Sequence, residues 1–559
     1  MKIQGMEKNI AGGLASLERM EQASRSAPQI SLETLMRLIR ENENTEYGKK
    51  YDFRNIHSYA DYARKVPLSE YQDYEPYLER MISFGTKNLI TSSDIELYAH
   101  TSGTSGASKL IPRTSKELEI LYHDIFQRVF GLYEKTNAGI RKGHLRGTRG
   151  LNFMETQIGF TPAGISHGAI SETLNHPEDT LQCSVLPEDI IYPAADFERR
   201  HVKLLFALRE KHLSFMMATF SPMIHDMLVY LQQHWRELCD DLEKGRIGDK
   251  VPVEPRLRAR LNAILTSNPK RAKEIRRIME KYEDGAFVPE IWPDLKLVAC
   301  VGTAAFAPYM EKIRHHLGPD IAVDQLGYVA SESTVAAQIK EGEEAYMLLP
   351  YSGFYEFIPV DDDSQTEEAP VLMDRLEVGR EYELIVTNLS GFYRYRIGDV
   401  IRVTGFHNKC PMIVFSYRKK QLISMYGEKV TESVMQNSVR KLAAESKTRI
   451  LEYSVYPDTD SDPGRYIVLL ESDREIGPSR WQSYSDILNR ILCEIHDSYR
   501  QKMERKIMLP LEVRFVQPQT YALYRDMKIM DGASPNQIKP IHVISGDKLK
   551  RFFFALLQG

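Results

Sequence analysis

The sequence LKLVACVGT at residues 295–303 carries the clearest signal of fold class. From Leu295 to Val301 it is apolar apart from Lys296, and it ends in Gly302 and Thr303. A short apolar run that ends at turn residues is typical of a strand buried on both faces of an α/β sheet. We therefore predict an α/β fold built around this strand.

Helical patterns precede this strand. Residues 1–100 are predicted to be mainly helical, and residues 201–244 to form two helices separated by Ser221 and Pro222, a good N-cap followed by a good first helical position. In the second helix, apolar residues recur at the spacing of a buried stripe. These residues are Ile224, Met227, Leu228, Leu231, Trp235 and Leu238. We interpret the stripe as core rather than as part of a cofactor site.

Strand patterns follow. Polar and apolar residues alternate at the start of residues 381–386, and residues 397–403 form a second β-like run after Gly391. This pattern predicts a hairpin-rich segment, and thus a β-rich subdomain, before about residue 417.

The pattern changes after about residue 418. It predicts a helix, two strands, a long amphipathic helix and a further strand, which together indicate a small α+β domain. Their expected ranges are 431–446, 450–456, 465–471, 480–507 and 511–516, and the C-terminal RFFFALLQG is expected to be a packed final helix. The charged run RKK at 418–420 marks a linker or hinge. The predicted boundaries are a large domain at 1–417, a hinge at 418–422 and a small domain at 423–559.

Composition narrows the functional class. The 559 residues include 73 Lys or Arg and 77 Asp or Glu, a formal net charge of −4, which excludes a polybasic nucleic-acid binder. The five cysteines form no C-x-x-C pair, which favours a reducing compartment. No apolar stretch approaches the length of a membrane span, so we expect a cytoplasmic protein without membrane partners. Nothing in the sequence indicates an oligomeric state.

A loop rich in glycine and hydroxyl groups is the densest chemical signal. Residues 101–109 read TSGTSGASK, which can turn backbone N–H groups, hydroxyls and the Lys109 ammonium toward a phosphate. The spacing of Gly103 and Gly106 does not match a Walker loop, and Ala107 stands where a nucleophile elbow needs glycine. The alternative is a flexible Ser/Gly surface loop.

Two later segments strengthen the interpretation of a nucleotide site. YVASE at 328–332 follows an apolar stretch, so Glu332 is predicted to lie where a strand leaves a sheet, the place where α/β proteins gather ligands. YRYRIGD at 393–399 places Asp399 after a glycine at the edge of a strand, where its carboxylate can accept from two ribose hydroxyls. Taken singly, each carboxylate has the alternative of an ordinary turn or surface residue.

These three motifs, in this order, resemble those of adenylate-forming enzymes, and more closely those of the acyl-acid amido synthetases of the auxin-responsive Gretchen Hagen family. Further similar stretches lie at residues 109–112, 216–245, 353–360, 378–408 and 532–540. The resemblance implies a large domain of sheets flanked by helices and a small mobile C-terminal domain. It also implies the activity: ATP and Mg²⁺ are used to adenylate a small carboxylic acid, and the acyl group then passes to an amino acid.

The resemblance also implies roles for particular residues. The phosphate contacts would be Ser102, Thr104 and Ser105. Tyr328 would border the adenine, Glu332 would coordinate magnesium, and Asp399 would bind the ribose. The small domain would bring Lys429 and Lys539 to the nucleotide, with Lys539 serving adenylation. Lys429 stands in GEKV, where plant members usually carry an Asp-Lys pair.

The sequence offers two candidate residues for the acyl-acid pocket and more than one possible acceptor. Tyr122 and Arg128, on the helix after Pro112, are candidates to face the acid carboxylate, although an arginine on a helix is more often an ion-pair partner. A ligase that uses coenzyme A with the same adenylate is the enzymatic alternative. A module that binds a nucleotide and an acid without turnover is the alternative outside enzymes. The presence of Glu332, Asp399 and Lys539 together argues against the latter.

Overall fold

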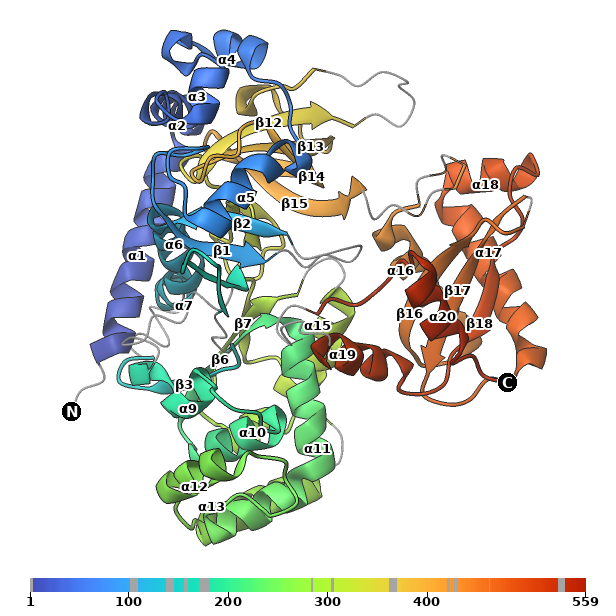
Figure 1. Ribbon diagram of the computed structural model, residues 1–559. Coiled ribbons are helices and arrows are strands. Elements are labelled where there is room, and N and C mark those ends of the chain that lie inside the picture. The colour runs from blue at the N-terminus through green and yellow to red at the C-terminus, as the bar shows by residue number, and fades with distance from the viewer. Residues whose placement is uncertain are drawn as a thin grey trace. The chain divides into compact units, whose positions relative to one another are not determined.

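The computed structural model divides into two compact units (Figure 1). It describes residues 4–100, 109–136, 145–154, 159–170, 181–282, 285–302, 306–360, 369–419, 423, 425–426, 428, 430–461, 463–530 and 538–559. The large unit holds the N-terminal hundred residues with 110–397 and 401–414, and the small unit holds 415–559 with the segment 398–400.

A parallel four-stranded sheet forms one core of the large unit. Its strand order is β3-β6-β7-β8, and every neighbouring pair is parallel. The strands are β3 (Arg149–Asn152), β6 (Leu213–Phe220), β7 (Leu297–Val301) and β8 (Ala322–Asp324). The prediction of a buried strand after Leu295 is confirmed, because residues 297–300 of β7 are fully enclosed.

Helices cover this sheet. They are α9 (Glu188–Ile191), α10 (Arg199–Arg209), α11 (Ser221–Lys244), α12 (Pro255–Ile264), α13 (Pro269–Lys281), α14 (Val288–Ile291) and α15 (Ala307–Leu317). The six stripe residues predicted on α11 are all buried in one cluster with β7 residues, which confirms the interpretation as core. Trp292 is also enclosed there, and its indole N–H donates to the Ala207 carbonyl at 3.0 Å.

The prediction of two helices between 201 and 244 is wrong in its first part. The first helix ends at Arg209, and residues 213–220 form strand β6. Leu, Met and Ala favour a helix when exposed, but here the run lies between two parallel neighbours and buries both faces, so tertiary packing outweighs propensity. Ser221 is also not the N-cap. Phe220 is, and the Ser221 hydroxyl donates to the Phe306 carbonyl instead.

Two further sheets lie mainly in the large unit, with residues 398–400 of β14 and 415–418 of β15 assigned to the small unit. A seven-stranded sheet has the order β12-β13-β14-β15-β11-β10-β9, and its members are β9 (Tyr328–Val329), β10 (Thr334–Ala337), β11 (Tyr346–Leu348), β12 (Gly353–Pro359), β13 (Glu381–Asn388), β14 (Tyr395–His407) and β15 (Cys410–Arg418). A four-stranded sheet has the order β2-β1-β5-β4, with β1 (Ile95–His100), β2 (Leu110–Thr114), β4 (Gly159–Phe160) and β5 (Ser166–Gly168). The predicted β-rich segment is thus confirmed.

Helices precede and connect these sheets. The N-terminal ones are α1 (Gln4–Ser24), α2 (Ala27–Glu41), α3 (Glu46–Lys50), α4 (Tyr59–Lys65) and α5 (Glu75–Phe84), as expected for a mainly helical start. After β2 the chain forms α6 (Ser115–Leu121), a π-helical turn (Tyr122–Gln127) and α7 (Arg128–Thr136). This continuous helix packs closely against α1, where Gly13 and Gly131 leave no room for a Cβ.

The small unit is an α+β domain, as predicted. Its sheet β16-β17-β18 consists of β16 (Ile450–Asp458), β17 (Arg465–Ser472) and β18 (Glu512–Phe515), and its helices are α16 (Glu432–Ser446), α17 (Trp481–Ile495), α18 (Asp497–Glu504), α19 (Thr520–Met530) and α20 (Asp547–Phe554). The long helix expected at 480–507 is broken at His496, which has extended backbone and accepts the Tyr499 N–H through its ring. Phe553 of the final helix is buried, as expected.

The structure bears on two features of the composition, the apolar segments and the cysteines. Across the described part of the chain, no helix combines the length and apolar character that a membrane span requires. The cysteines at 183, 239, 300, 410 and 493 are all free thiols, and all but Cys493 are buried.

The α11 stripe yields a stability prediction. Replacing Leu228, which is 2% exposed, by Ala should lower the free energy of unfolding by about 2–5 kcal/mol, since it removes buried methyl groups and leaves a cavity. Urea denaturation followed by circular dichroism measures the loss. Gln233→Ala, at an exposed position of the same helix, is the control. Equal effects of the two substitutions would contradict the assignment of the buried face.

Candidate functional site

The glycine-rich loop connects two adjacent strands of the large unit. β1 ends at His100 and antiparallel β2 begins at Leu110, with His100 paired to Leu110. Ser102, Thr104 and Ser105 lie outside the described residues, so their predicted phosphate contacts stay a prediction. The strands on either side are well defined, and they carry the contacts that connect the loop to the other two motifs.

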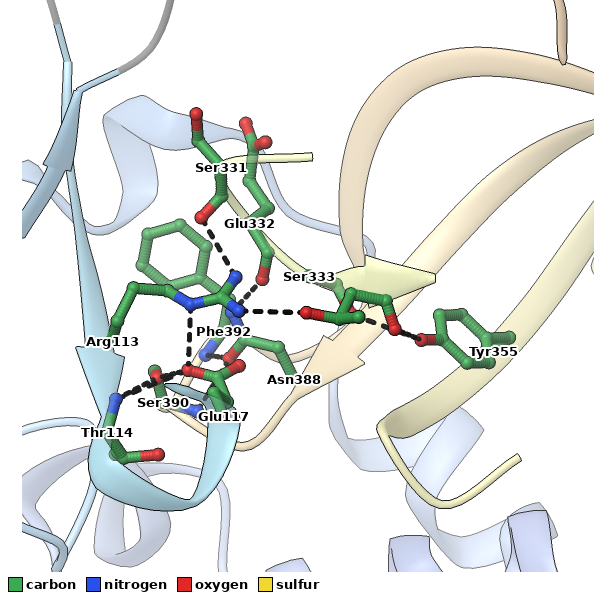
Figure 2. Close-up of polar contacts among 11 residues, drawn as sticks. Arg113, Thr114, Glu117, Ser331, Glu332, Ser333, Tyr355, Asn388, Ser390 and Phe392 are labelled. Carbon is green, nitrogen blue, oxygen red and sulfur yellow. Dashed lines mark hydrogen bonds and ion pairs between the residues drawn. The ribbon is translucent and has the colours of Figure 1, made fainter. Parts of the chain in front are cut away.

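Arg113, on β2, is the centre of a buried polar network (Figure 2). Its side chain has no exposed surface. One terminal nitrogen donates to the Ser331 carbonyl at 3.2 Å, and the other donates to the Thr334 hydroxyl at 3.2 Å. Nε lies 3.4 Å from a carboxylate oxygen of Glu117. Arg113 thus connects the strand after the loop to both sides of the turn that contains Glu332.

Glu117, in the first turn of α6, continues the network. Its carboxylate accepts from the Thr114 N–H at 3.4 Å and from the Ser390 hydroxyl. The Thr114 N–H also reaches the Ser390 oxygen at 3.2 Å. Burial raises the pKa of Glu117 and outweighs the opposing charge of Arg113. Glu117 therefore joins β2 to the turn that follows β13.

Asn388, at the end of β13, reaches the Glu332 segment directly. Its amide nitrogen donates to the Glu332 carbonyl at 2.8 Å. Its amide oxygen accepts from the N–H groups of Ser390 and Phe392 at 3.0 and 2.9 Å. One buried side chain therefore shapes the turn before the YRYRIGD motif and holds the backbone of Glu332.

Serine hydroxyls hold the remaining sides of the Glu332 turn. The Ser331 hydroxyl donates to the carbonyl of His100, the last residue of β1, at 3.0 Å. Ser333 lies 3.1 Å from the hydroxyl of Tyr355, a fully buried residue of β12. The segment 331–334 is thus fixed by contacts to β1, β2, β12 and β13.

Glu332 itself is 8% exposed, in the turn between β9 and β10. Its carboxylate points away from Arg113 and Glu117, while its carbonyl faces Asn388 (Figure 2). In the described part of the chain no group of three or more His, Cys, Asp or Glu side chains is arranged to hold a metal ion. A single carboxylate fits magnesium that takes its other ligands from phosphate and water. Tyr328, also predicted for the site, is on β9, the adjoining strand, and is 9% exposed.

Asp399, on β14, is buried and paired with Arg418 at the end of β15. Arg418 Nε lies 2.5 Å from one carboxylate oxygen, and a terminal nitrogen lies 3.1 Å from the other. Arg418 is the first residue of the predicted hinge. The ion pair therefore connects the ribose candidate to the segment where the small domain was expected to begin.

The two candidates for the acyl pocket differ. The Arg128 guanidinium, fully buried, forms a bidentate pair with Asp324 at 3.0 and 2.8 Å and donates to two backbone carbonyls. These contacts match the alternative interpretation of Arg128, as an ion-pair partner within the fold, and they offer no support for a substrate role. Tyr122, in the π-helical turn, is 9% exposed and donates its hydroxyl to the Asn9 amide oxygen at 3.1 Å.

The small unit carries the lysine candidates. Lys539 is half-buried in the segment before α20, and Lys429 lies outside the described residues. Glu428, which precedes Lys429 in the sequence, is buried. Its carboxylate accepts from the N–H groups of Met425 and Tyr426 at 2.8 Å each, and it contacts the Tyr466 hydroxyl. The glutamate of GEKV is therefore an anchor for the local turn.

Sequence reasoning missed Arg113, Glu117, Asn388 and Ser390. Thr114-x-x-Glu117 matches the helix-start pattern of a hydroxyl residue followed three positions later by glutamate, and that signal marks the start of α6. It does not show that the glutamate is buried against an arginine. The contacts of Asn388 and Ser390 depend on tertiary structure and leave no local pattern.

Solved structures share this fold. The structure of GH3.15 acyl acid amido synthetase superposes with a TM-score of 0.83 at 23% identity, covering 97% of this chain and 96% of that one. A second structure of that synthetase, in complex with 2,4-DB, gives the same TM-score at 22% identity and covers 98% of this chain and 96% of its own. The fold is thus that of an acyl acid amido synthetase.

Family models identify the chain more closely. The GH3 family N-terminal domain matches residues 16–322, the GH3 family central domain matches 346–418, and the GH3 family C-terminal domain matches 430–548. The chain belongs to the GH3 family.

Characterised relatives span nearly the same length. Indole-3-acetic acid-amido synthetase GH3.8 of Oryza sativa subsp. indica is 29% identical, over 94% of this chain and 90% of that protein. Jasmonoyl--L-amino acid synthetase GH3.5 of Oryza sativa subsp. japonica is 26% identical, over 94% of this chain and 93% of its own.

The buried network yields the second prediction. Arg113→Met should lower the free energy of unfolding by about 3–5 kcal/mol, because it leaves the Glu117 carboxyl buried without its ion-pair partner. Adding Glu117→Gln should restore much of the loss, since the uncompensated acid is then gone. Guanidinium denaturation measures both variants.

The control is Arg80→Met, which breaks an exposed bidentate pair with Glu46 at 3.0 and 2.9 Å. It should leave the denaturation midpoint nearly unchanged. A similarly small effect of Arg113→Met would show that the buried network does not hold the turn.

Proposed function

We propose that the protein is an ATP-dependent acyl-acid amido synthetase, which adenylates a small carboxylic acid and transfers the acyl group to an amino acid. The observation that supports this most strongly is the Arg113 network, which joins the strands beside the glycine-rich loop to the Glu332 turn and to the turn before Asp399. The network connects the strands that flank the loop, the Glu332 turn and the turn at 388–392, in a chain of the GH3 family.

The first half-reaction activates the acid. A carboxylate oxygen attacks the α-phosphorus of ATP, the bond to the β-phosphate oxygen breaks, and pyrophosphate leaves with that electron pair. Neutralising charge and aligning the attack supply most of the catalysis in such a phosphoryl-type transfer. The loop hydroxyls of Ser102, Thr104 and Ser105 are proposed to hold the phosphate oxygens.

The remaining nucleotide contacts come from the other two motifs. Tyr328 is proposed to border the adenine and Asp399 to accept from the ribose hydroxyls. Glu332 is proposed as the protein's magnesium ligand, because its carboxylate is directed out of the network by a backbone fixed on four sides. The bound Mg²⁺ would neutralise phosphate charge.

The small domain is proposed to supply Lys539 for adenylation, with Lys429 as a second lysine for the nucleotide. An ammonium stabilises charge that develops on the bridging and α-phosphate oxygens. We place the hinge at 418–422, between a large domain at 1–417 and a small domain at 423–559. The Arg418 pair with Asp399 supports this position, since it connects the ribose site to the start of the hinge.

The second half-reaction forms the amide. The amino acid's neutral amine attacks the acyl carbon, the carbon–oxygen bond to AMP breaks, and the amine proton is released. Tyr122 remains a candidate for the acid pocket through its π-helical position, which is a common location of functional residues. The five free thiols support a reducing compartment such as the cytoplasm.

The direct test is product identification. The protein is incubated with ATP, Mg²⁺, pooled aromatic and aliphatic acids and the standard amino acids, beside a parallel reaction that contains coenzyme A. Mass spectrometry should find amide conjugates together with AMP. Thioesters alone would identify a coenzyme A ligase, and bound ATP without either product would leave a binding module; both outcomes contradict the proposal.

Glu332 provides the third prediction. Glu332→Gln should lower the rate of acid-dependent ATP–pyrophosphate exchange about 100-fold or more, because it removes the negative charge that the metal requires. Raised Mg²⁺ should recover part of the rate. Glu344→Gln, at an exposed position of the next connection, between β10 and β11, is the control. Exchange at the wild-type rate in Glu332→Gln would refute the role of Glu332.

Asp399 provides the fourth. Asp399→Asn should raise the KM for ATP about tenfold or more, since a charged acceptor for two hydroxyls is lost. Arg418→Met keeps the carboxylate while removing its ion pair, and should raise that KM less. Equal effects of the two variants, or an unchanged KM in Asp399→Asn, would show that Asp399 serves the hinge pair and not the ribose.

A further inference from the structure

A buried ion pair joins the two segments of the small unit that carry the lysine candidates. Glu432 follows Lys429 by three positions and begins α16, and His542 follows Lys539 by three positions. His542 Nδ1 lies 2.5 Å from a carboxylate oxygen of Glu432. The His542 side chain is 5% exposed and that of Glu432 is 23% exposed. The contact is thus mostly shielded from water.

The imidazole is held from three directions. Glu432 approaches from α16. Glu452, on β16, lies 3.9 Å from Nε2. The ring stacks on Tyr453 with centroids 4.3 Å apart and planes 8° apart. An imidazole fixed in this way has one orientation available, and its two nitrogens face two carboxylates.

Backbone contacts fix the rest of the segment after Lys539. The Val455 N–H donates to the His542 carbonyl, and the Ile544 N–H donates to the Val455 carbonyl, both at 2.8 Å. The Ser454 hydroxyl donates to the Ile541 carbonyl. Residues 541–544 therefore run parallel to β16, and His542 supplies the side-chain link from this strip to α16.

The charges in this cluster are coupled. Burial would lower the pKa of His542, but hydrogen bonds and charge from Glu432 and Glu452 outweigh it and raise that pKa to about 9. Burial would raise the pKa of Glu432, but His542 and, after it, the charge of Lys539 lower it. At neutral pH the histidine is therefore an imidazolium and Glu432 a carboxylate that also attracts the Lys539 ammonium.

We propose that His542 and Glu432 are positioning residues for adenylation: their ion pair fixes the segment that carries Lys539 to α16, so that this lysine is presented to the nucleotide in one position. This inference rests on the proposed function. In this proposal neither residue of the pair contacts the nucleotide, and both act through Lys539.

The first experiment is a double-mutant cycle on acid-dependent ATP–pyrophosphate exchange. His542→Phe keeps a ring to stack on Tyr453 but removes Nδ1, and should lower kcat about 10- to 100-fold while KM for ATP stays within about twofold, because misplacing a catalytic group mainly slows the chemical step. Glu432→Gln should cost less, since its amide oxygen still accepts from Nδ1. Adding His542→Phe to Lys539→Ala should cause little further loss, because the lysine it positions is gone.

The control is Tyr484→Phe, which removes another buried hydroxyl contact of the small unit, to Thr448 at 2.6 Å. It should lower the melting temperature but leave kcat unchanged, both in the wild-type protein and in the Lys539→Ala variant. The double variant could instead lose kcat by the product of the two single-variant factors. That result would show that His542 acts independently of Lys539, and it would overturn the proposal.

The second experiment is the alkaline limb of the kcat profile. The two carboxylates raise the pKa of His542 from its ordinary value of 6.5 to about 9 in the folded protein. The ion pair therefore contributes its full stability below pH 6.5, and this contribution is lost as pH rises through about 9. In Glu432→Gln the histidine loses its closest carboxylate, so the decline in kcat should begin at lower pH. If kcat of Glu432→Gln declines at the same pH as kcat of the wild-type protein, the proposal is overturned, even if His542→Phe fails to fold. Wild-type protein that exchanges no pyrophosphate with any acid would instead refute the proposed function.

Discussion

The large unit's site depends on one interaction, the buried ion pair between Arg113 and Glu117. Two charges removed from water are costly unless their remaining hydrogen-bonding positions are filled. Here the Ser331 carbonyl, the Thr334 hydroxyl and the Ser390 hydroxyl fill three of these positions, and they lie in the Glu332 turn and in the turn before the YRYRIGD motif. The need to satisfy the pair therefore draws three distant stretches of chain to one place, and Glu332 is presented as a consequence.

In the small unit, too, an ion pair shielded from water connects distant segments of the chain. Its lysine candidates stand on segments far apart in sequence, and a buried imidazolium–carboxylate pair connects those segments. In both units the candidate catalytic groups are supported by buried charges beside them. This arrangement suits an enzyme whose first step depends on precise placement of charge around a phosphate.

Local patterns in the sequence predicted most elements of the fold. β7 was recognisable because burial on both faces leaves a continuous apolar run, and α11 because burial on one face leaves apolar residues at helical spacing. β6 was missed because Leu, Met and Ala are good helix formers, and only its parallel neighbours make it a strand. The motifs pointed to Glu332 and Asp399 as candidates, but Arg113, Asn388 and His542 make their contacts through tertiary structure that no local pattern encodes. Arg128 is the opposite case. The sequence made it a candidate to face the acid carboxylate, and in the structure its guanidinium pairs with the carboxylate of Asp324.

The central claim, that the three motifs activate a carboxylate by adenylation, is tested most directly by isotope transfer. The accepted acid is labelled with ¹⁸O in its carboxyl group and converted to the amide in the presence of ATP and an amino acid. If the acid oxygen attacks the α-phosphorus, one ¹⁸O must appear in the phosphate of AMP, and mass spectrometry will detect it. Label in inorganic phosphate, or unlabelled AMP beside labelled water, would contradict the account.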